Sequence, residues 1–312
     1  MLRYLAVTSV DDIHAGVNCL AFNNDGRYFA SGGHDGALYI FEARDGRLIR
    51  RYLAHSAIQA IAWDGQFLNT VIAGDQAGDV YSICILGQSE AHDRTWIEHV
   101  PGPIYAMTTL GSLLAISSGN GIYIVTKNSP DSWGTLAALP PPPSPFHSHT
   151  VALTGPVATC IHFVNNDRLV ATFLQHGIVG YDLHTHSILW QLQPRTCYTG
   201  ASHLSPDNSA VATTNLYDGI DWYTLQGVHL EGLRLKRHSY TTLMNIRDDL
   251  NVILPIKFIE GGTAIVLGGT DGLAHIISSG IGGGDRQVLD HRDGVVQALV
   301  GHPLFGIRAF AF

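Results

Sequence analysis

Histidine pairs are the residues whose type and spacing best suit a chemical role in this chain of 312 residues. His147 and His149 form one His-x-His pair, and His184 and His186 form another. Alternate residues of an extended strand point to the same side, so each pair could offer two imidazoles to a zinc or copper ion. Neither pair has a cysteine or carboxylate at the usual ligand spacing. We therefore predict no metal site and no cofactor.

Motifs of nucleotide-binding loops and hydrolases are missing from the sequence. In the glycine-rich run at 280–285, Asp285 stands where GxGxxG needs its last glycine, and the run follows an expected strand without opening a helix. The turn carboxylates Asp75, Asp79 and Asp221 could form an acid/base pair only if the fold brought them together. Isolated turn aspartates are the simpler interpretation. The sequence therefore predicts a protein that is not an enzyme.

The charge balance argues against a nucleic-acid partner. The chain has 18 Lys+Arg against 26 Asp+Glu, a formal net charge of -8 and a pI near 6.1. Binding to phosphates needs a basic stripe, which this sequence does not offer. The basic clusters at 44–51 and 234–238 fall where outer strands are expected, and charge on an edge strand protects against edge-to-edge aggregation.

Compartment and membrane contact follow from the apolar runs and the cysteines. No stretch approaches the roughly 18 apolar residues of a membrane span, and the first apolar run is too short for a signal-peptide core. Cys19, Cys84, Cys160 and Cys197 are widely scattered, without a CxxC pair. We expect a cytoplasmic protein with reduced thiols and no membrane partner.

The elements that must position any site follow a repeat. The turn pair Asp35-Gly36 has weaker copies along the whole chain, at Gly36, Gly78, Gly121, Gly177, Gly219 and Gly272. Successive glycines are 42, 43, 56, 42 and 53 residues apart. A period of about 40 to 45 residues is typical of four short strands and their turns.

One repeat can be followed strand by strand. Val17–Phe22 alternates in the manner of a strand and ends in a hairpin signal, Asn23–Gly26. Further strands are expected at 28–31, 37–41 and 48–53. Four antiparallel strands in about 40 residues correspond to one blade of a β-propeller.

The same order recurs and predicts an all-β, seven-bladed β-propeller of four-stranded antiparallel blades, as a single domain over residues 1–312. The first strands of blades two to six are expected at 58–63, 104–107, 157–163, just before Ser205, and 254–258. A seventh blade is expected from 291–299 and 304–312, with Leu2–Thr8 as its outer strand. One strand of this blade is then missing, or the chain is part of a longer product.

Two insertions explain the long spacings. Residues 127–150 contain Pro140–Pro143, which offers no donors to a sheet ladder and is expected to loop out as a rigid spacer. A proline-motif ligand for an aromatic-grooved domain is the alternative interpretation. Residues 225–251 form the second insertion.

On period and turn order, the chain resembles the WD-repeat β-propellers over essentially its whole length. In that family, a histidine before the first strand, a Ser or Thr in the second, an Asp in the following turn and a Trp ending the third form a hydrogen-bonded network. The resemblance implies this network for His14, Ser31 and Asp35. Phe41 stands at the Trp position and, without an indole N–H, can only pack. We expect Asp35→Ala to destabilise the protein more than Asp75→Ala, because Asp75 is interpreted as a solvated turn residue.

The resemblance also implies a function, namely a non-enzymatic scaffold that presents a rigid face to protein partners. Partners of the family often bind where first strands begin and where the turns between second and third strands emerge. Transferred to this sequence, the face comprises Asn18, His34, Gln59, Gln76, Tyr105, Tyr217 and Thr270. The alternative is a carbohydrate-binding propeller using Tyr105, Trp133, Trp222 and Asn215. No aromatic-plus-amide set recurs in several blades, as repeated sugar pockets would require.

Overall fold

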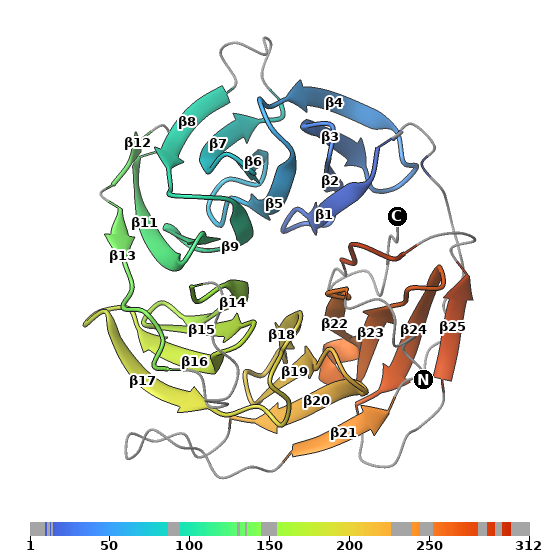
Figure 1. Cartoon of the computed structure of the whole chain (residues 1–312). Coiled ribbons are helices and arrows are strands. Elements are labelled where there is room, and N and C mark those ends of the chain that lie inside the picture. Colours follow the sequence, from blue (N-terminus) through green and yellow to red (C-terminus); the bar gives the residue numbers. More distant parts are fainter. Residues whose placement is uncertain are drawn as a thin grey trace. The chain divides into compact units, whose positions relative to one another are not determined.

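The structure is a computed structural model, and its strands form six antiparallel sheets among the described residues (Figure 1). It describes residues 10, 13, 15–86, 94–129, 132–134, 136–144, 155–225, 239–243, 252–279, 286–290 and 295–300. These residues fall into two compact units, an N-terminal unit within Ala6–Leu139 and a C-terminal unit within Pro140–Phe312. Within the described ranges, no helix has the length and apolar character needed to cross a membrane.

The N-terminal unit contains the first three sheets. The first sheet consists of β1 (Val17–Phe22), β2 (Tyr28–Gly33), β3 (Ala37–Glu42) and β4 (Leu48–Leu53). The second consists of β5 (Ile58–Trp63), β6 (Thr70–Asp75), β7 (Asp79–Cys84) and β8 (Arg94–His99). The third consists of β9 (Ile104–Leu110), β10 (Leu113–Ser118), β11 (Gly121–Ser129), β12 (Ser132–Trp133) and β13 (Ala137–Ala138).

The C-terminal unit contains the other three sheets. The fourth sheet consists of β14 (Ala158–Asn165), β15 (Arg168–Phe173), β16 (Gly177–Asp182) and β17 (Ser187–Leu192). The fifth consists of β18 (Ser202–Leu204), β19 (Ala210–Thr214), β20 (Gly219–Thr224) and β21 (Ser239–Leu243). The sixth consists of β22 (Ile256–Ile259), β23 (Ala264–Gly268), β24 (Leu273–Ser278) and β25 (Arg286–Asp290), with a short 3-10 turn, η1 (Glu260–Gly262), after β22.

The core lies between neighbouring sheets of each unit. The middle strands are covered on both faces, and every residue of β2 is buried, whereas the outer strand β4 has one buried residue, Tyr52. Leu38 and Ile40 of β3 belong to the same apolar cluster as Ile58 of β5 and Val71 of β6. This packing explains the near-continuous apolar runs of the middle strands, because both faces of each strand are removed from water.

Four of the six predicted turn glycines have the left-handed backbone geometry that such a turn favours, whereas Gly219 has a more extended φ of 150°. Gly36, Gly78, Gly177 and Gly272 all have positive φ values between 75° and 97°. At Gly78 an added Cβ would lie 2.1 Å from the carbonyl oxygen of Val100, so only glycine fits. In the third sheet the prediction of Gly121 was wrong. Ser118 pairs with Gly121, which makes Gly119 (φ 52°) the turn glycine of a tighter, two-residue loop.

The described residues form six blade-like sheets, and most of the predicted seventh lies outside them. Leu2–Thr8 and 304–312 are not among the described residues. Of the predicted strand at 291–299, residues 295–300 are described and are not in a strand. Val296 and Leu299 are nevertheless buried against the sixth sheet. A strand requires a hydrogen-bonded neighbour, and the neighbours predicted for this segment lie outside the described part of the chain.

Both predicted insertions are shorter than expected. Lys127–Ser129 extends β11, and β12 and β13 pair back onto that strand. The described prolines that follow are in no strand, in agreement with their lack of donors. Within the second predicted insertion, β21 pairs with β20 as the fourth strand of its sheet. Polar composition concealed these outer strands, since an outer strand needs apolar residues on only one face.

Candidate functional site

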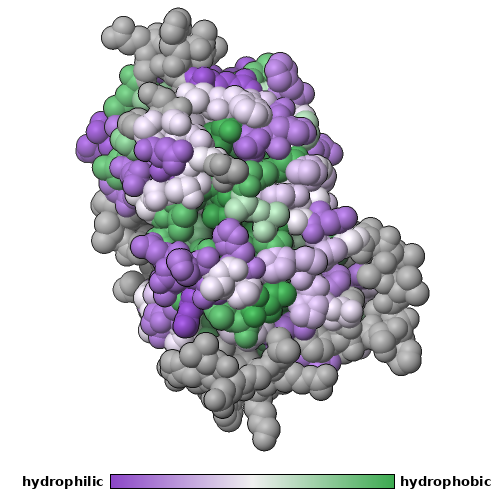
Figure 2. Space-filling model, turned by 90° about the vertical axis from the view of Figure 1, so that its left-hand side faces the viewer, coloured by the Kyte–Doolittle hydropathy of each residue, from purple (hydrophilic) through white to green (hydrophobic). Residues whose placement is uncertain are grey.

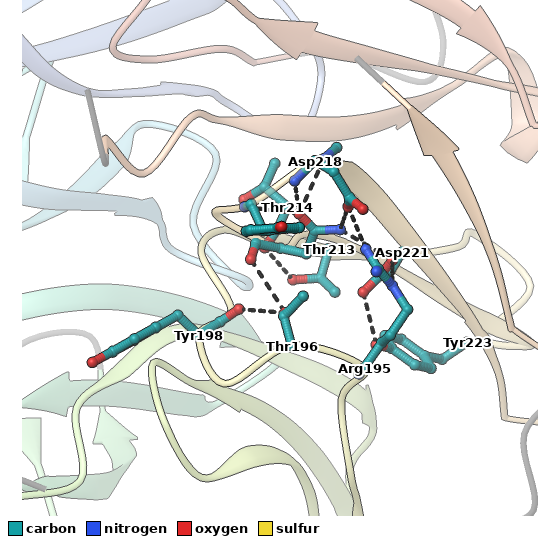
Figure 3. Close-up of polar contacts among 11 residues, drawn as sticks. Arg195, Thr196, Tyr198, Thr213, Thr214, Asp218, Asp221 and Tyr223 are labelled. Atoms are coloured by element: carbon teal, nitrogen blue, oxygen red, sulfur yellow. Dashed lines mark hydrogen bonds and ion pairs between the residues drawn. The ribbon is translucent and has the colours of Figure 1, made fainter. Parts of the chain in front are cut away.

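Arg195 is the centre of a polar cluster in the C-terminal unit. It lies in the connection between β17 and β18, and its guanidinium forms ion pairs with Asp218 and Asp221 of the fifth sheet. The Nε–Oδ1 distance to Asp221 is 3.3 Å. Figure 3 shows Arg195 between the two carboxylates, with Tyr223 beside them. Burial lowers the pKa of Arg195, but the hydrogen bond to Asp218 and the charges of both aspartates outweigh burial and leave the pKa raised.

The partners of Asp221 keep a buried carboxylate satisfied. The Asp221 side chain is 1% exposed. Its Oδ1 accepts hydrogen bonds from Arg195 and from Asn215 Nδ2 (3.1 Å), and its Oδ2 accepts one from the Tyr223 hydroxyl (3.2 Å). A buried charge left without such partners costs several kcal/mol. Asp221 therefore belongs to the supporting structure of the turn.

Asn215 organises the turn between β19 and β20. Its Oδ1 accepts three backbone hydrogen bonds, from Tyr217 N (3.0 Å), Asp218 N (2.9 Å) and Gly219 N (3.0 Å). Its Nδ2 donates to both aspartates, at 2.7 Å to Asp218 and 3.1 Å to Asp221. A short polar side chain that accepts from the following N–H groups is a strong turn former. The same bonds hold Leu216 in the left-handed region, with a φ of 53°.

Two exposed tyrosines lie on the segments that this cluster fixes. Tyr217 follows the strained Leu216 and is 72% exposed, and Tyr198 is 41% exposed. Thr196 Oγ1 lies 2.8 Å from the carbonyl oxygen of Tyr198 and 3.2 Å from that of Asn215, which ties the two segments together. The ring of Tyr198 points away from the cluster in Figure 3. We call Arg195, Tyr198 and Tyr217 the blade-five rim.

Exposure of an apolar residue elsewhere is not by itself informative. On the side of the molecule seen in Figure 2, hydrophobic residues form patches bordered by hydrophilic residues. Such a mixture is ordinary for protein surfaces. The blade-five rim differs because a single buried side chain, Asn215, accepts from three consecutive backbone N–H groups beside an exposed tyrosine.

The network expected in the first sheet is not formed by the residues that the structure describes. Asp35 is exposed, and its carboxylate accepts from Ala37 N (3.0 Å) and the Tyr39 hydroxyl (3.2 Å). Ser31 Oγ is buried and has no partner among the described residues. His14 lies outside the described residues. Tyr39 thus bonds to the carboxylate that the family pattern places in the network.

Phe41 packs in the first sheet. Its ring is fully buried and stacks on Phe29, with 4.9 Å between the ring centroids. Without an N–H it makes no polar link there.

The interpretation of Asp75 as a solvated residue was wrong. Asp75 is fully buried, and its Oδ1 accepts from Ala77 N and Asp79 N, both at 3.0 Å. His99 Nδ1 forms a hydrogen bond with Asp79 Oδ1 at 2.9 Å. This bond is the main cause of the lowered pKa of Asp79. Asp75, Asp79 and Asp221 each have their own local partners, so no acid/base pair among them is indicated.

The residues predicted for the partner-binding face divide into two groups. His34, Gln76, Tyr105 and Tyr217 are exposed. Asn18, Gln59 and Thr270 are partly buried. The Asn18 side chain donates to the carbonyl oxygen of Ile58 at 2.9 Å and so links two neighbouring sheets. Its role is structural in this respect.

Three of the residues named for sugar binding are buried or engaged in contacts within their own unit. Trp222 is buried and packs edge-on against Phe258, and Asn215 is buried in its turn. Trp133 lies over Lys127, with 5.2 Å from Nζ to the ring centroid. The carbohydrate hypothesis therefore has no support from these positions.

Among the described residues, no three His, Cys, Asp or Glu side chains are arranged to hold a metal ion. His184 and His186 are exposed at the turn before β17, and the other pair, His147 and His149, lies outside the described residues.

Comparison with known proteins agrees with this architecture. Residues 6–42 match the family model described as "WD domain, G-beta repeat". The chain carries a WD repeat in a β-propeller fold. It is similar to the β-propeller domain of Cps50 (Swd1) from Myceliophteria thermophila, with 16% sequence identity, a TM-score of 0.73, and coverage of 94% of this chain and 92% of that one. At this identity the likeness shows the fold of the WD-repeat propeller alone. A search of curated proteins gave no significant match.

Sequence reasoning missed Arg195 and Asn215 as parts of one site. The WD-repeat pattern has no position for an arginine in the connection between blades four and five. The signal that could have found Asn215 is its place three residues before Asp218 and four before the turn glycine Gly219, which is typical of an asparagine-capped turn.

Proposed function

We propose that this WD-repeat propeller is a non-enzymatic scaffold for protein partners, and that the blade-five rim is part of its binding face. The observation that carries the proposal is a pair of exposed tyrosines on fixed backbone. The buried side chain of Asn215 holds the backbone at Tyr217, and Thr196 Oγ1 bonds to the carbonyl oxygens of Tyr198 and Asn215. Tyrosine and arginine are over-represented among the residues that dominate interface energies.

Rigidity is the physical reason for preferring this surface. Ordering a flexible loop on binding costs free energy, which a turn already fixed in the unbound protein does not have to supply. The turn at 215–219 is fixed by three N–H bonds to one side chain. Arg195, whose side chain is 37% exposed, retains surface for a partner while its ion pairs hold it in place.

Affinity purification with quantitative mass spectrometry tests this proposal. The test variant is Tyr198→Ala with Tyr217→Ala, and the matched control is Trp96→Ala, an aromatic residue on β8 that is 55% exposed. We expect proteins captured by the wild type and the control to be lost from the double variant, with unchanged melting temperatures. Identical captured proteins for all three would exclude the blade-five rim as the binding surface.

We further propose that the propeller closes with a seventh blade. The support for closure is the buried Val296 and Leu299, with Val296 N donating to the carbonyl oxygen of Gly269 at 2.9 Å. Deleting residues 301–312 should lower the melting temperature if they cover this segment, and an unchanged value would count against closure.

We also propose that the protein acts in the cytoplasm. Fluorescence microscopy of the tagged protein tests this location.

A further inference from the structure

The first strands of the fourth, fifth and sixth blades bring together a second group of titratable side chains. His162 lies on β14, His203 on β18 and Lys257 on β22. The two imidazole rings meet edge to face, with 5.4 Å between centroids and 78° between planes. We call these three residues the His–Lys cluster. It is distinct from the blade-five rim, because no residue is shared.

Hydrogen bonds assign the protons of both imidazoles. His162 Nε2 lies 3.1 Å from the carbonyl oxygen of Ser202, which can only accept, so Nε2 carries a proton. His203 Nδ1 accepts from Phe258 N at 3.2 Å. The neutral His203 ring therefore carries its proton on Nε2. That N–H has no acceptor among the described residues.

Within the described part of the chain, no acidic side chain compensates the charge of Lys257. Burial lowers its pKa, and the Cys160 thiol acts weakly in the opposite direction, with no carboxylate contributing. Burial, followed by the charge of Lys257, lowers the pKa of His162 to about 3 and that of His203 well below its ordinary value. Both rings are therefore neutral around Lys257. Among the described residues, Lys257 Nζ has no hydrogen-bond or ion-pair partner.

Lys127 is a buried lysine with a structural role, and its counter-charge can be compared with the surroundings of Lys257. Its Nζ forms a buried ion pair with Asp64 and lies 4.3 Å from the ring centroid of Phe67. The pair supplies the counter-charge that a buried cation requires. Lys257, which is partly exposed, has no such partner among the described residues, although it too lies on a strand of a packed blade. The contrast indicates a cation whose counter-charge comes from outside the described residues.

We infer that the His–Lys cluster binds a small oxyanion, a phosphate group, which pairs with the Lys257 ammonium and accepts a hydrogen bond from His203 Nε2. An oxyanion has several acceptor atoms and can take bonds from both donors at once. Charge-assisted bonds of this kind are roughly twice as strong as neutral ones. The donors recognise the phosphate group itself, whether it is free or carried by a small metabolite.

Calorimetric titration of the full chain with inorganic phosphate, at ionic strength matched with chloride, tests this site. The test variant is Lys257→Gln, and the control is Arg168→Gln, which removes an exposed cation at the start of β15. We expect binding to weaken at least about tenfold in Lys257→Gln and to be unchanged in Arg168→Gln. Without anion, Lys257→Gln should melt at a higher temperature than the wild type, because an uncompensated cation has been removed.

A second variant keeps the test decisive if Lys257→Gln folds poorly. His203→Asn retains an acceptor for Phe258 N but loses the Nε2 proton, so binding should again weaken. O-phosphoserine in place of inorganic phosphate distinguishes the two sources. Tighter binding assigns the site to a phosphate carried by a small metabolite, and equal or weaker binding assigns it to the free ion. Equal phosphate affinity in the wild type, Lys257→Gln and His203→Asn, or no measurable binding to the wild type, would overturn the inference.

Discussion

The turn between the second and third strands is held by different hydrogen-bond networks in the first and fifth blades. In the first blade, Asp35 is exposed, and its partners among the described residues, Ala37 N and Tyr39, both lie in its own hairpin. In the fifth blade, the buried Asn215 caps three N–H groups and reaches two aspartates that also hold Arg195. The blade with the better family signature therefore has the weaker network. A residue's contribution follows from its burial and partners, whatever its place in the repeat.

The largest effect should come from removing the cap of the fifth blade. Asn215→Ala leaves three backbone N–H groups and part of the Asp221 carboxylate without partners. Each buried group left unsatisfied costs about 1–3 kcal/mol. Because water can bond to some of the uncapped groups, we expect a total loss of about 3 kcal/mol in the free energy of unfolding. Urea denaturation measures it. The matched variant Asp35→Ala should lose less than about 1 kcal/mol, and equal losses would break the comparison.

A smaller difference should separate Asp75 from Asp35. Asp75→Ala removes the acceptor of two N–H groups inside the second blade, at a cost of about 2 kcal/mol. In Asp35→Ala, water can accept the hydrogen bonds that the exposed carboxylate accepted, so the cost is smaller. This order is the reverse of the one expected from the family pattern. Thermal unfolding of both variants checks it, and a lower melting temperature for Asp35→Ala would restore the original expectation.

Acid should act on the C-terminal blades through His162. Its pKa in the folded chain is about 3, against about 6.5 in an unfolded chain. Below pH 6.5 the unfolded chain binds a proton that the folded chain excludes, so stability is complete above pH 6.5 and is lost as pH falls toward 3. At pH 5.5 this amounts to at most about 1.4 kcal/mol for one histidine.

His162→Gln isolates that contribution. Chemical denaturation at pH 7.5 and 5.5 should show a smaller acid loss in the variant than in the wild type. His34→Gln is the control from the first blade, where the histidine is exposed, and its acid loss should match that of the wild type. An identical pH dependence in His162→Gln would mean that His162 takes up a proton in the folded chain.

The smallest effect on stability belongs to the residue proposed to matter most for binding. Tyr217 is 72% exposed, and surface substitutions away from special features change stability by less than about 0.5 kcal/mol. Tyr217→Ala should therefore leave the melting temperature unchanged while weakening partner capture. A clear fall in melting temperature would place Tyr217 in the framework of the turn.

Much of the architecture could be read from local patterns. The strands at 17–22, 37–42 and 58–63 follow from alternation and from turn residues a few positions away, which act through the backbone of the same segment. Gly36 and Gly78 were predictable because a positive φ is a property of one residue. Gly119 was missed because strand pairing, and not the glycine spacing, sets which residues occupy a two-residue turn.

Only the tertiary structure decided which polar residues meet. Arg195 lies 23 and 26 positions before Asp218 and Asp221, and His162, His203 and Lys257 come from three different blades. The blade order and the turns could be predicted from the sequence, because both depend on residues that are close to one another in the chain. Burial of Asp75 and exposure of Asp35, at matching turns, depend on which side chains of other strands cover each carboxylate. That covering arises from packing between sheets, and no local pattern in the sequence records it.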